Sequence, residues 1–78
     1  MDSLAFDRDS MVMTYYSTMR GVNDGSLLDM ASAIPKQLES DYAEGGQFAV
    51  YEENGVAVRL VYFLEHRAHW KTFQYPRP

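Results

Sequence analysis

The sequence predicts a single α+β domain in which two or three N-terminal helices pack on a C-terminal three-stranded antiparallel β-meander. The chain has 78 residues, 46% of them hydrophobic, which is typical of one small globular domain. Apolar residues recur at helical spacing in the first half, and strand-like runs fill the second half. Because the pattern changes at Gly45-Gly46, we expect the helical part over about residues 4–44 and the meander over about residues 47–75.

The first helix is expected to begin at a cap formed by Asp9 or Ser10, to run through Arg20 and to end at a left-handed Gly21. We expect Leu4–Phe6 either to extend this helix backwards or to pack as an N-terminal arm. The helix would bury one apolar stripe, made of Met11, Val12, Tyr15, Tyr16 and Met19.

A second helix is expected to begin near Ser26, after a turn at residues 23–25. Pro35 would either end this helix or open a third, because proline is tolerated at the first position of a helix. The third helix would run to about Ala43, where Glu44-Gly45-Gly46 terminates it. The apolar face of the second helix comprises Leu27, Leu28, Met30, Ala31 and Ile34.

The second half of the chain predicts three strands. Asn54-Gly55 lies between the strand-like runs Gln47–Glu53 and Val56–Glu65, and this dipeptide favours a two-residue type I′ turn. A third strand, His69–Tyr75, would pair with the second through a turn at residues 66–68. These runs together predict the meander.

Composition excludes several classes of function. The chain has no cysteine, which excludes disulfides, thiolate catalysis and cysteine-based zinc sites. Its formal charge of −4 predicts repulsion from bare nucleic acid and attraction to basic surfaces. We find no hydrophobic run long enough to span a membrane, and Met1-Asp2-Ser3 lacks the positive charge of a signal peptide. The expected location is therefore the cytoplasm.

One pair of histidines hints at a metal. His66 and His69 are three residues apart and lie beside Glu65, but zinc requires three or four ligands and no further ligand is evident. We interpret both as surface histidines at a turn and expect no metal and no other cofactor. Since no nucleophile motif or phosphate-binding loop is present either, we expect no enzymatic activity.

Acidic residues form the main candidate site. A plain solvated surface is one explanation of their abundance, and a soluble hairpin tip explains the pair beside Asn54. The alternative is that the carboxylates imitate the spacing of phosphates and bind a basic surface that normally holds DNA. The candidate partner-binding residues are Asp24, Asp29, Glu39, Asp41, Glu44, Glu52 and Glu53.

Two other functions fit the sequence. The last predicted strand interleaves basic with aromatic residues, as single-stranded nucleic-acid platforms do. Ordinary alternation in a strand gives the same composition, and the negative net charge of the chain opposes nucleic-acid binding. A homodimeric adaptor that pairs through an edge strand or a tyrosine patch is also consistent. The residues of the alternative nucleic-acid site are Arg67, Trp70, Lys71, Phe73 and Tyr75.

In its small size, its lack of cysteine, its net acidity, its pattern of helices plus a meander and its lack of a catalytic set, the chain resembles the small acidic inhibitor proteins of bacteriophages, including anti-CRISPR proteins. This resemblance rests on general features and assigns no role to an individual residue. It implies a stoichiometric inhibitor, monomeric or homodimeric, that binds a nucleic-acid-handling complex such as a Cas complex. Such an inhibitor would block DNA binding by DNA mimicry or by wedging a subunit.

Overall fold

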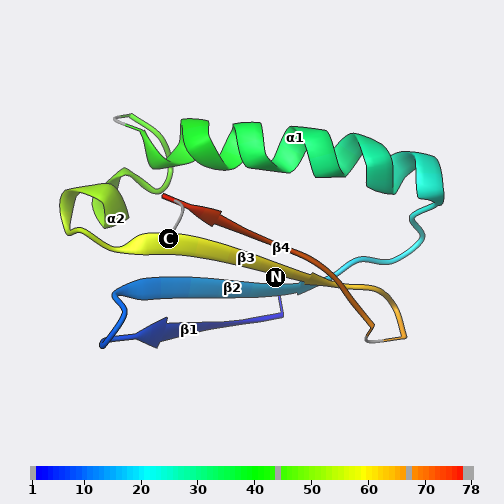
Figure 1. Cartoon of the computed structure of the whole chain (residues 1–78), viewed down its shortest axis with the longest axis horizontal. Coiled ribbons are helices and arrows are strands. Elements are labelled where there is room, and N and C mark those ends of the chain that lie inside the picture. The colour runs from blue at the N-terminus through cyan, green and yellow to red at the C-terminus, as the bar shows by residue number, and fades with distance from the viewer. Residues whose placement is uncertain (1, 44, 67, 77–78) are drawn as a thin grey trace.

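The computed structural model describes residues 2–43, 45–66 and 68–76. Its four strands form one mixed sheet, and the long helix runs along one face of that sheet (Figure 1). The predicted fold class is therefore wrong, because the helices lie in the middle of the chain rather than before a three-stranded meander. The elements in chain order are β1 (Ser3–Asp7), β2 (Val12–Thr18), α1 (Asp24–Tyr42), α2 (Ala49–Glu53), β3 (Ala57–Phe63) and β4 (His69–Tyr75).

The sheet has the strand order β1-β2-β3-β4. The two outer pairs are antiparallel, whereas β2 and β3 are parallel, from Val12 beside Ala57 to Thr18 beside Phe63. Parallel neighbours require a crossover connection, and the segment that contains α1 and α2 supplies it. The centre of the sheet thus joins two segments that are far apart in the sequence.

The first predicted helix, from Asp9 or Ser10 to Arg20, is wrong. A turn at residues 8–11 is followed by β2, and Leu4–Phe6 forms the middle of β1. The composition of β2, VMTYYST, explains this outcome because β-branched and aromatic residues favour extended backbone. Gly21 does take the predicted left-handed conformation, with a φ of 67°, but it follows a strand rather than a helix.

The second and third predicted helices are one helix, α1. It begins with Asn23 as its cap, whose side-chain oxygen accepts a 2.8 Å hydrogen bond from the N–H of Ser26. Pro35 lies inside the helix, although its missing N–H removes one main-chain hydrogen bond. Leu27 before the proline and Leu38 after it lie on the same helical stripe, so burial of that stripe favours an unbroken helix.

The predicted strand Gln47–Glu53 is also wrong, since residues 49–53 form α2. A helical turn directs Phe48 and Tyr51 to the same side, where both rings pack on Tyr15 of β2. The ring centroids of Phe48 and Tyr51 lie 5.5 and 6.5 Å from that of Tyr15. The hydroxyls of Tyr15 and Tyr51 are hydrogen-bonded at 2.7 Å. Aromatic packing therefore accounts for the helix at this position.

The dipeptide Asn54-Gly55 ends α2 instead of forming a type I′ turn. Asn54 has a φ of −99°, whereas a type I′ turn requires positive values at both residues. Gly55, with a φ of 69°, turns the chain towards β3. The strand that follows pairs with β2 and β4, so no hairpin forms around Asn54-Gly55.

The last strand is confirmed with its predicted bounds. β4 spans His69–Tyr75 and pairs antiparallel with β3, with Leu60 opposite Phe73 and Val58 opposite Tyr75. A register shift near Tyr62 makes the pairing irregular towards the hairpin.

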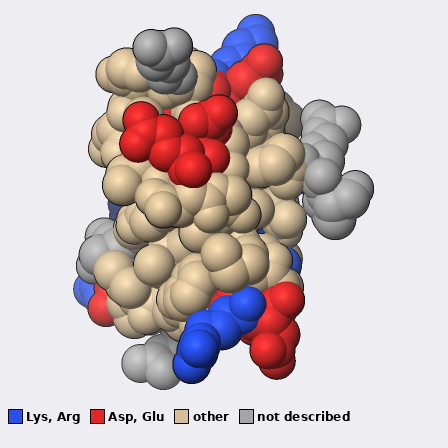
Figure 2. All heavy atoms as spheres, turned by 90° about the vertical axis from the view of Figure 1, so that its left-hand side faces the viewer, with Lys and Arg blue, Asp and Glu red and all other residues tan. Residues whose placement is uncertain are grey.

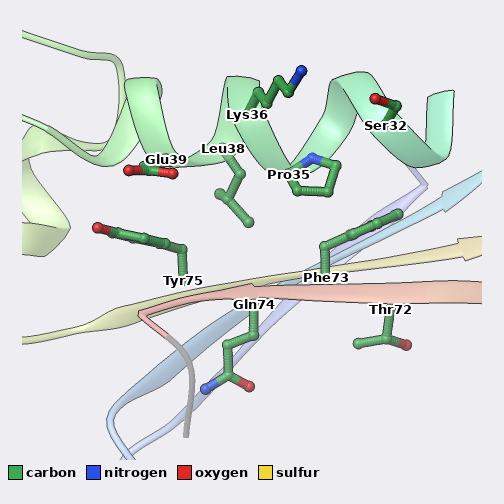
Figure 3. A pocket seen from close by; sticks show the side chains of 9 residues that line it. All are labelled: Ser32, Pro35, Lys36, Leu38, Glu39, Thr72, Phe73, Gln74 and Tyr75. Atoms are coloured by element: carbon green, nitrogen blue, oxygen red, sulfur yellow. The ribbon is translucent and has the colours of Figure 1, made fainter. Parts of the chain in front are cut away.

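The core lies between α1 and the sheet. Leu38 and Tyr42 of α1 pack with Val58 of β3, which is fully buried. Phe73 and Tyr75 point towards α1, whereas Thr72 and Gln74 point away from it (Figure 3). The rings and side chains packed around the three buried residues are Tyr15, Phe48, Tyr51, Leu60, Phe73 and Tyr75.

The helical layer covers only part of the sheet. α1 lies beside β4, and β1 is the strand farthest from it (Figure 1). Leu4 and Phe6 of β1 are accordingly 51% and 44% exposed. One edge of the sheet therefore carries apolar side chains that no described helix covers.

Candidate interaction surfaces

The acidic residues of α1 are spread along its length. Asp24 lies in the first turn and Asp41 next to the last residue, which places them about 26 Å apart along the axis. Asp29 and Glu39 lie between them, and both are exposed. These four carboxylates therefore do not meet at one point.

Asp41 is held by its own chain. One of its carboxylate oxygens accepts a 2.8 Å hydrogen bond from the side chain of Gln37, and the other accepts a 2.7 Å bond from Gln47. Its main-chain oxygen accepts a 2.7 Å bond from the N–H of Phe48. Asp41 thus joins the end of α1 to the segment that leads into α2, and its carboxylate is already occupied.

The acidic pair Glu52 and Glu53 lies on α2, so the two carboxylates are not on opposite faces of a strand as the predicted hairpin implied. Adjacent residues of a helix are about 100° apart, and both of these are exposed. Burial, and then the negative charge of Glu52, raises the pKa of Tyr42 at the end of α1.

The end of the molecule at which α2 lies carries acidic side chains in separate groups. Figure 2 shows them with uncharged surface between, and with Lys and Arg side chains beside some of them. Within the described residues, no side-chain hydrogen bond involves the carboxylates of Asp29, Glu39, Glu52 or Glu53. These four groups are free to contact another molecule. Glu44, the remaining acidic candidate, lies outside the described residues.

The aromatic residues of β4 do not form an open platform. Phe73 and Tyr75 are turned towards α1, where the ring of Tyr75 lies 5.3 Å from that of Tyr42. Trp70 packs against Phe73 with 6.1 Å between centroids, and the ammonium group of Lys71 lies 5.9 Å from the centre of the Trp70 ring. Arg67 lies outside the described residues. The structure thus brings Trp70 and Lys71 together, but uses Phe73 and Tyr75 in packing.

A groove of about 750 Å³ runs between α1 and β4 (Figure 3). Leu38, Phe73 and Tyr75 supply apolar surface, and Lys36 and Glu39 lie on its helical side. The described lining contains no serine–histidine or carboxylate pair arranged for acid–base catalysis. The groove therefore has an apolar floor and charged side chains at its rim.

The edge strand β1 was not predicted from the sequence, in which Leu4–Phe6 is expected to extend a helix or to pack as an arm. The segment SLAFD alternates polar or small residues with Leu4 and Phe6, which is a strand pattern of period two. Asp7 then closes the turn after β1, since its carboxylate accepts the N–H of Asp9 at 3.0 Å. Hydrogen bonds from Ser10 and then from Asp9 hold the pKa of Asp7 below its usual range. This local alternation was the signal that could have identified β1.

Among the residues that the structure describes, no three histidine or acidic side chains gather in a way that could hold a metal ion. No helix in the described ranges combines the length and the apolar character that a membrane span requires. Comparisons of the chain with models of protein families, with curated proteins and with solved structures found no match.

Proposed function

We propose that this chain is a non-enzymatic, cytoplasmic interaction protein that binds a basic, nucleic-acid-binding surface of a protein partner and blocks its access to DNA. The contact is the acidic end of the molecule formed by Glu52 and Glu53 on α2. The observation that supports this proposal is that both carboxylates are exposed and that neither takes part in a hydrogen bond within the described chain.

The chemistry of the contact is charge pairing. Each carboxylate would accept hydrogen bonds from an Arg or Lys that otherwise holds a phosphate. The net charge of −4 would steer the chain towards such a surface. Exposed charges are screened by salt, so binding should weaken steeply as ionic strength rises. A Cas complex is one partner with a surface of this kind.

A capture experiment tests this proposal. The tagged chain is incubated with a bacterial lysate, with and without nuclease, and captured proteins are identified by mass spectrometry. We expect a DNA-handling protein to be captured in both conditions and to lose DNA binding when the chain is added to the purified partner. Capture that disappears after nuclease treatment would contradict the proposal and direct attention to Trp70 and Lys71.

Charge reversal then tests the site. The Glu52→Lys/Glu53→Lys variant should lose most of its affinity for the captured partner. The Asp29→Lys/Glu39→Lys variant changes the net charge by the same amount on α1 and should retain most of it. Equal losses from both variants would mean that net charge alone, and not the end formed by α2, controls binding.

A further inference from the structure

The main-chain hydrogen bonds of β2 are divided between its two neighbours. The N–H of Ala57 donates to the oxygen of Met11 at 2.9 Å, and the N–H of Met19 donates to the oxygen of Phe63 at 2.8 Å. Successive residues of a strand direct their main-chain groups to opposite sides. The odd-numbered residues from Met11 to Met19 therefore bond to β3, and the even-numbered ones bond to β1.

This alternation determines which residues of β1 are bonded to the sheet. The partners of the even-numbered residues of β2 are Ser3, Ala5 and Asp7. Their N–H and C=O groups point towards β2, so those of Leu4 and Phe6 point outwards from the free edge. An unpaired edge of this kind is a template for another strand.

The side chains at the same edge are apolar and uncovered. Leu4 pairs with Tyr15 of β2, which packs on the core, so Leu4 and Phe6 lie on the face of the sheet along which α1 runs. The helix lies over the opposite edge of that face, beside β4 (Figure 1), and the two side chains are 51% and 44% exposed. No proline or charged residue interrupts the stretch from Leu4 to Phe6. The devices by which edge strands commonly avoid pairing are thus absent from this stretch.

We propose that two copies of this chain associate through β1, antiparallel and with Ala5 opposite Ala5 of the partner subunit, to form one continuous eight-stranded sheet. In this arrangement Leu4 and Phe6 form the hydrogen-bonded pairs of the new ladder. Ala5 occupies the non-hydrogen-bonded position, where strands approach most closely and a small side chain fits.

The sequence of β1 favours this register over the other two that pair outward-facing residues. A dimer centred on Leu4 would place Phe6 opposite Asp2, whose N–H already bonds to the main-chain oxygen of Tyr16 and whose carboxylate already accepts from the hydroxyl of Thr18. A dimer centred on Phe6 would place Leu4 opposite Arg8, in the turn after β1. A dimer centred on Ala5 instead places Leu4 opposite Phe6 of the partner subunit, so that each apolar residue faces an apolar one. Its cross-strand pairs are Leu4 with Phe6 and Ser3 with Asp7, each occurring twice.

A second copy is the occupant that this complementarity specifies. The matched pairs depend on reading the same segment in both directions, which is the property of an isologous interface about a two-fold axis. That axis is perpendicular to the sheet, so both α1 helices lie on the same face. The Leu4 and Phe6 side chains of the two copies then pack together between the two helical layers.

Cysteine cross-linking tests the pairing and its register. The chain has no cysteine, so one introduced thiol is the only one present. Ala5→Cys should form a covalent dimer in high yield under mild oxidation, because facing Cα atoms at a non-hydrogen-bonded pair lie within disulfide distance. Leu28→Cys, on the 75% exposed Leu28 of α1, should remain mostly monomeric under the same conditions.

A mixed experiment keeps the register testable even if Ala5→Cys fails to fold. Ser3→Cys chains mixed with Asp7→Cys chains should form the mixed disulfide in preference to either like pair. The proposed interface would be overturned if disulfides formed preferentially between identical chains. It would also be overturned if cross-linking were no faster than that of Leu28→Cys.

Molar mass in solution supplies the second test. Light scattering after gel filtration should give twice the chain mass of 9.0 kDa for the wild type. Phe6→Lys should raise the dissociation constant by about 100-fold or more while the circular dichroism spectrum stays unchanged. Leu28→Lys should leave the dimer intact. A wild-type chain that stays monomeric at high micromolar concentration would overturn the proposal, whatever the outcome of partner capture.

Discussion

The hydroxyl of Tyr42 donates a 2.9 Å hydrogen bond to the main-chain oxygen of Val56. This bond ties the last residue of α1 to the residue before β3, and both residues are buried. It closes the crossover at the point where the chain leaves the helices and re-enters the sheet. The bond thus fixes the end of the crossover next to the first residue of β3.

Removal of the hydroxyl tests that role. Tyr42→Phe should lower the free energy of unfolding by about 1–2 kcal/mol, because the buried oxygen of Val56 loses its donor. Urea unfolding followed by circular dichroism measures the change. Tyr16→Phe, on the sheet face away from α1, serves as the control and should change stability by less than about 0.5 kcal/mol. A Tyr42→Phe variant as stable as the wild type would contradict the role of this bond.

Gly46 is predicted to be essential for the turn between the helices. A Cβ atom at this position would lie 2.2 Å from the main-chain oxygen of Asp41 and 2.6 Å from that of Ser40. Because main-chain atoms must move to make room, Gly46→Ala should cost about 2 kcal/mol or more of stability. Thermal and urea unfolding measure this loss.

A second glycine supplies the control. At Gly25, in the first turn of α1, a Cβ atom would make an ordinary contact of 3.4 Å with the side chain of Asn23. Gly25→Ala should therefore be neutral or stabilising by up to about 1 kcal/mol, in line with the helix propensity of alanine. If both variants behaved alike, the close approach at Gly46 would not be the reason for its glycine.

Only the features that are local in the sequence were predictable. The strand His69–Tyr75 was predicted correctly because its neighbour in the sheet is also its neighbour along the chain. β2 was predicted as a helix because Met11, Val12, Tyr15 and Met19 fit a helical period, although the strand partners that favour extended backbone lie in a remote segment. Asn54-Gly55 also ends helices, so the dipeptide alone could not distinguish a hairpin from the end of α2.

The prediction of the candidate site was limited for the same reason. The sequence identified the acidic residues, but not that Asp41 is engaged by Gln37 and Gln47 while Glu52 and Glu53 are exposed. Aromatic residues of β4 suggested a stacking surface, yet Phe73 and Tyr75 pack against α1. Composition reports which groups are present, whereas the fold decides which of them face solvent.

Asp41 should therefore affect folding more than binding. Asp41→Ala removes two hydrogen bonds to glutamine side chains and should cost about 1–2 kcal/mol of stability. Glu39→Ala, an exposed acid on the same helix, should change stability by less than about 0.5 kcal/mol. Urea unfolding of the two variants distinguishes them. An Asp41→Ala variant with unchanged stability would show that these hydrogen bonds contribute little in solution.

Alkaline pH should destabilise the fold through three tyrosines that packing shields at least partly from water. Burial, and then the hydrogen bond with Tyr51, raises the pKa of Tyr15 to about 12, and burial raises the pKa values of Tyr42 and Tyr62 as well. A tyrosine in the unfolded chain ionises near pH 10, so between about pH 10 and 12 the folded state binds more protons than the unfolded state.

Stability contributed by Tyr15 is thus fully present below about pH 10 and is lost as the pH rises towards 12. The free energy of unfolding in urea should fall between about pH 10 and 12. The tyrosinate absorbance of the folded chain should include a late step that Tyr15→Phe reduces, while Tyr42 and Tyr62 supply the rest of it. A titration in which all tyrosines ionise near pH 10 while the chain stays folded would contradict the packing of Tyr15 against Tyr51.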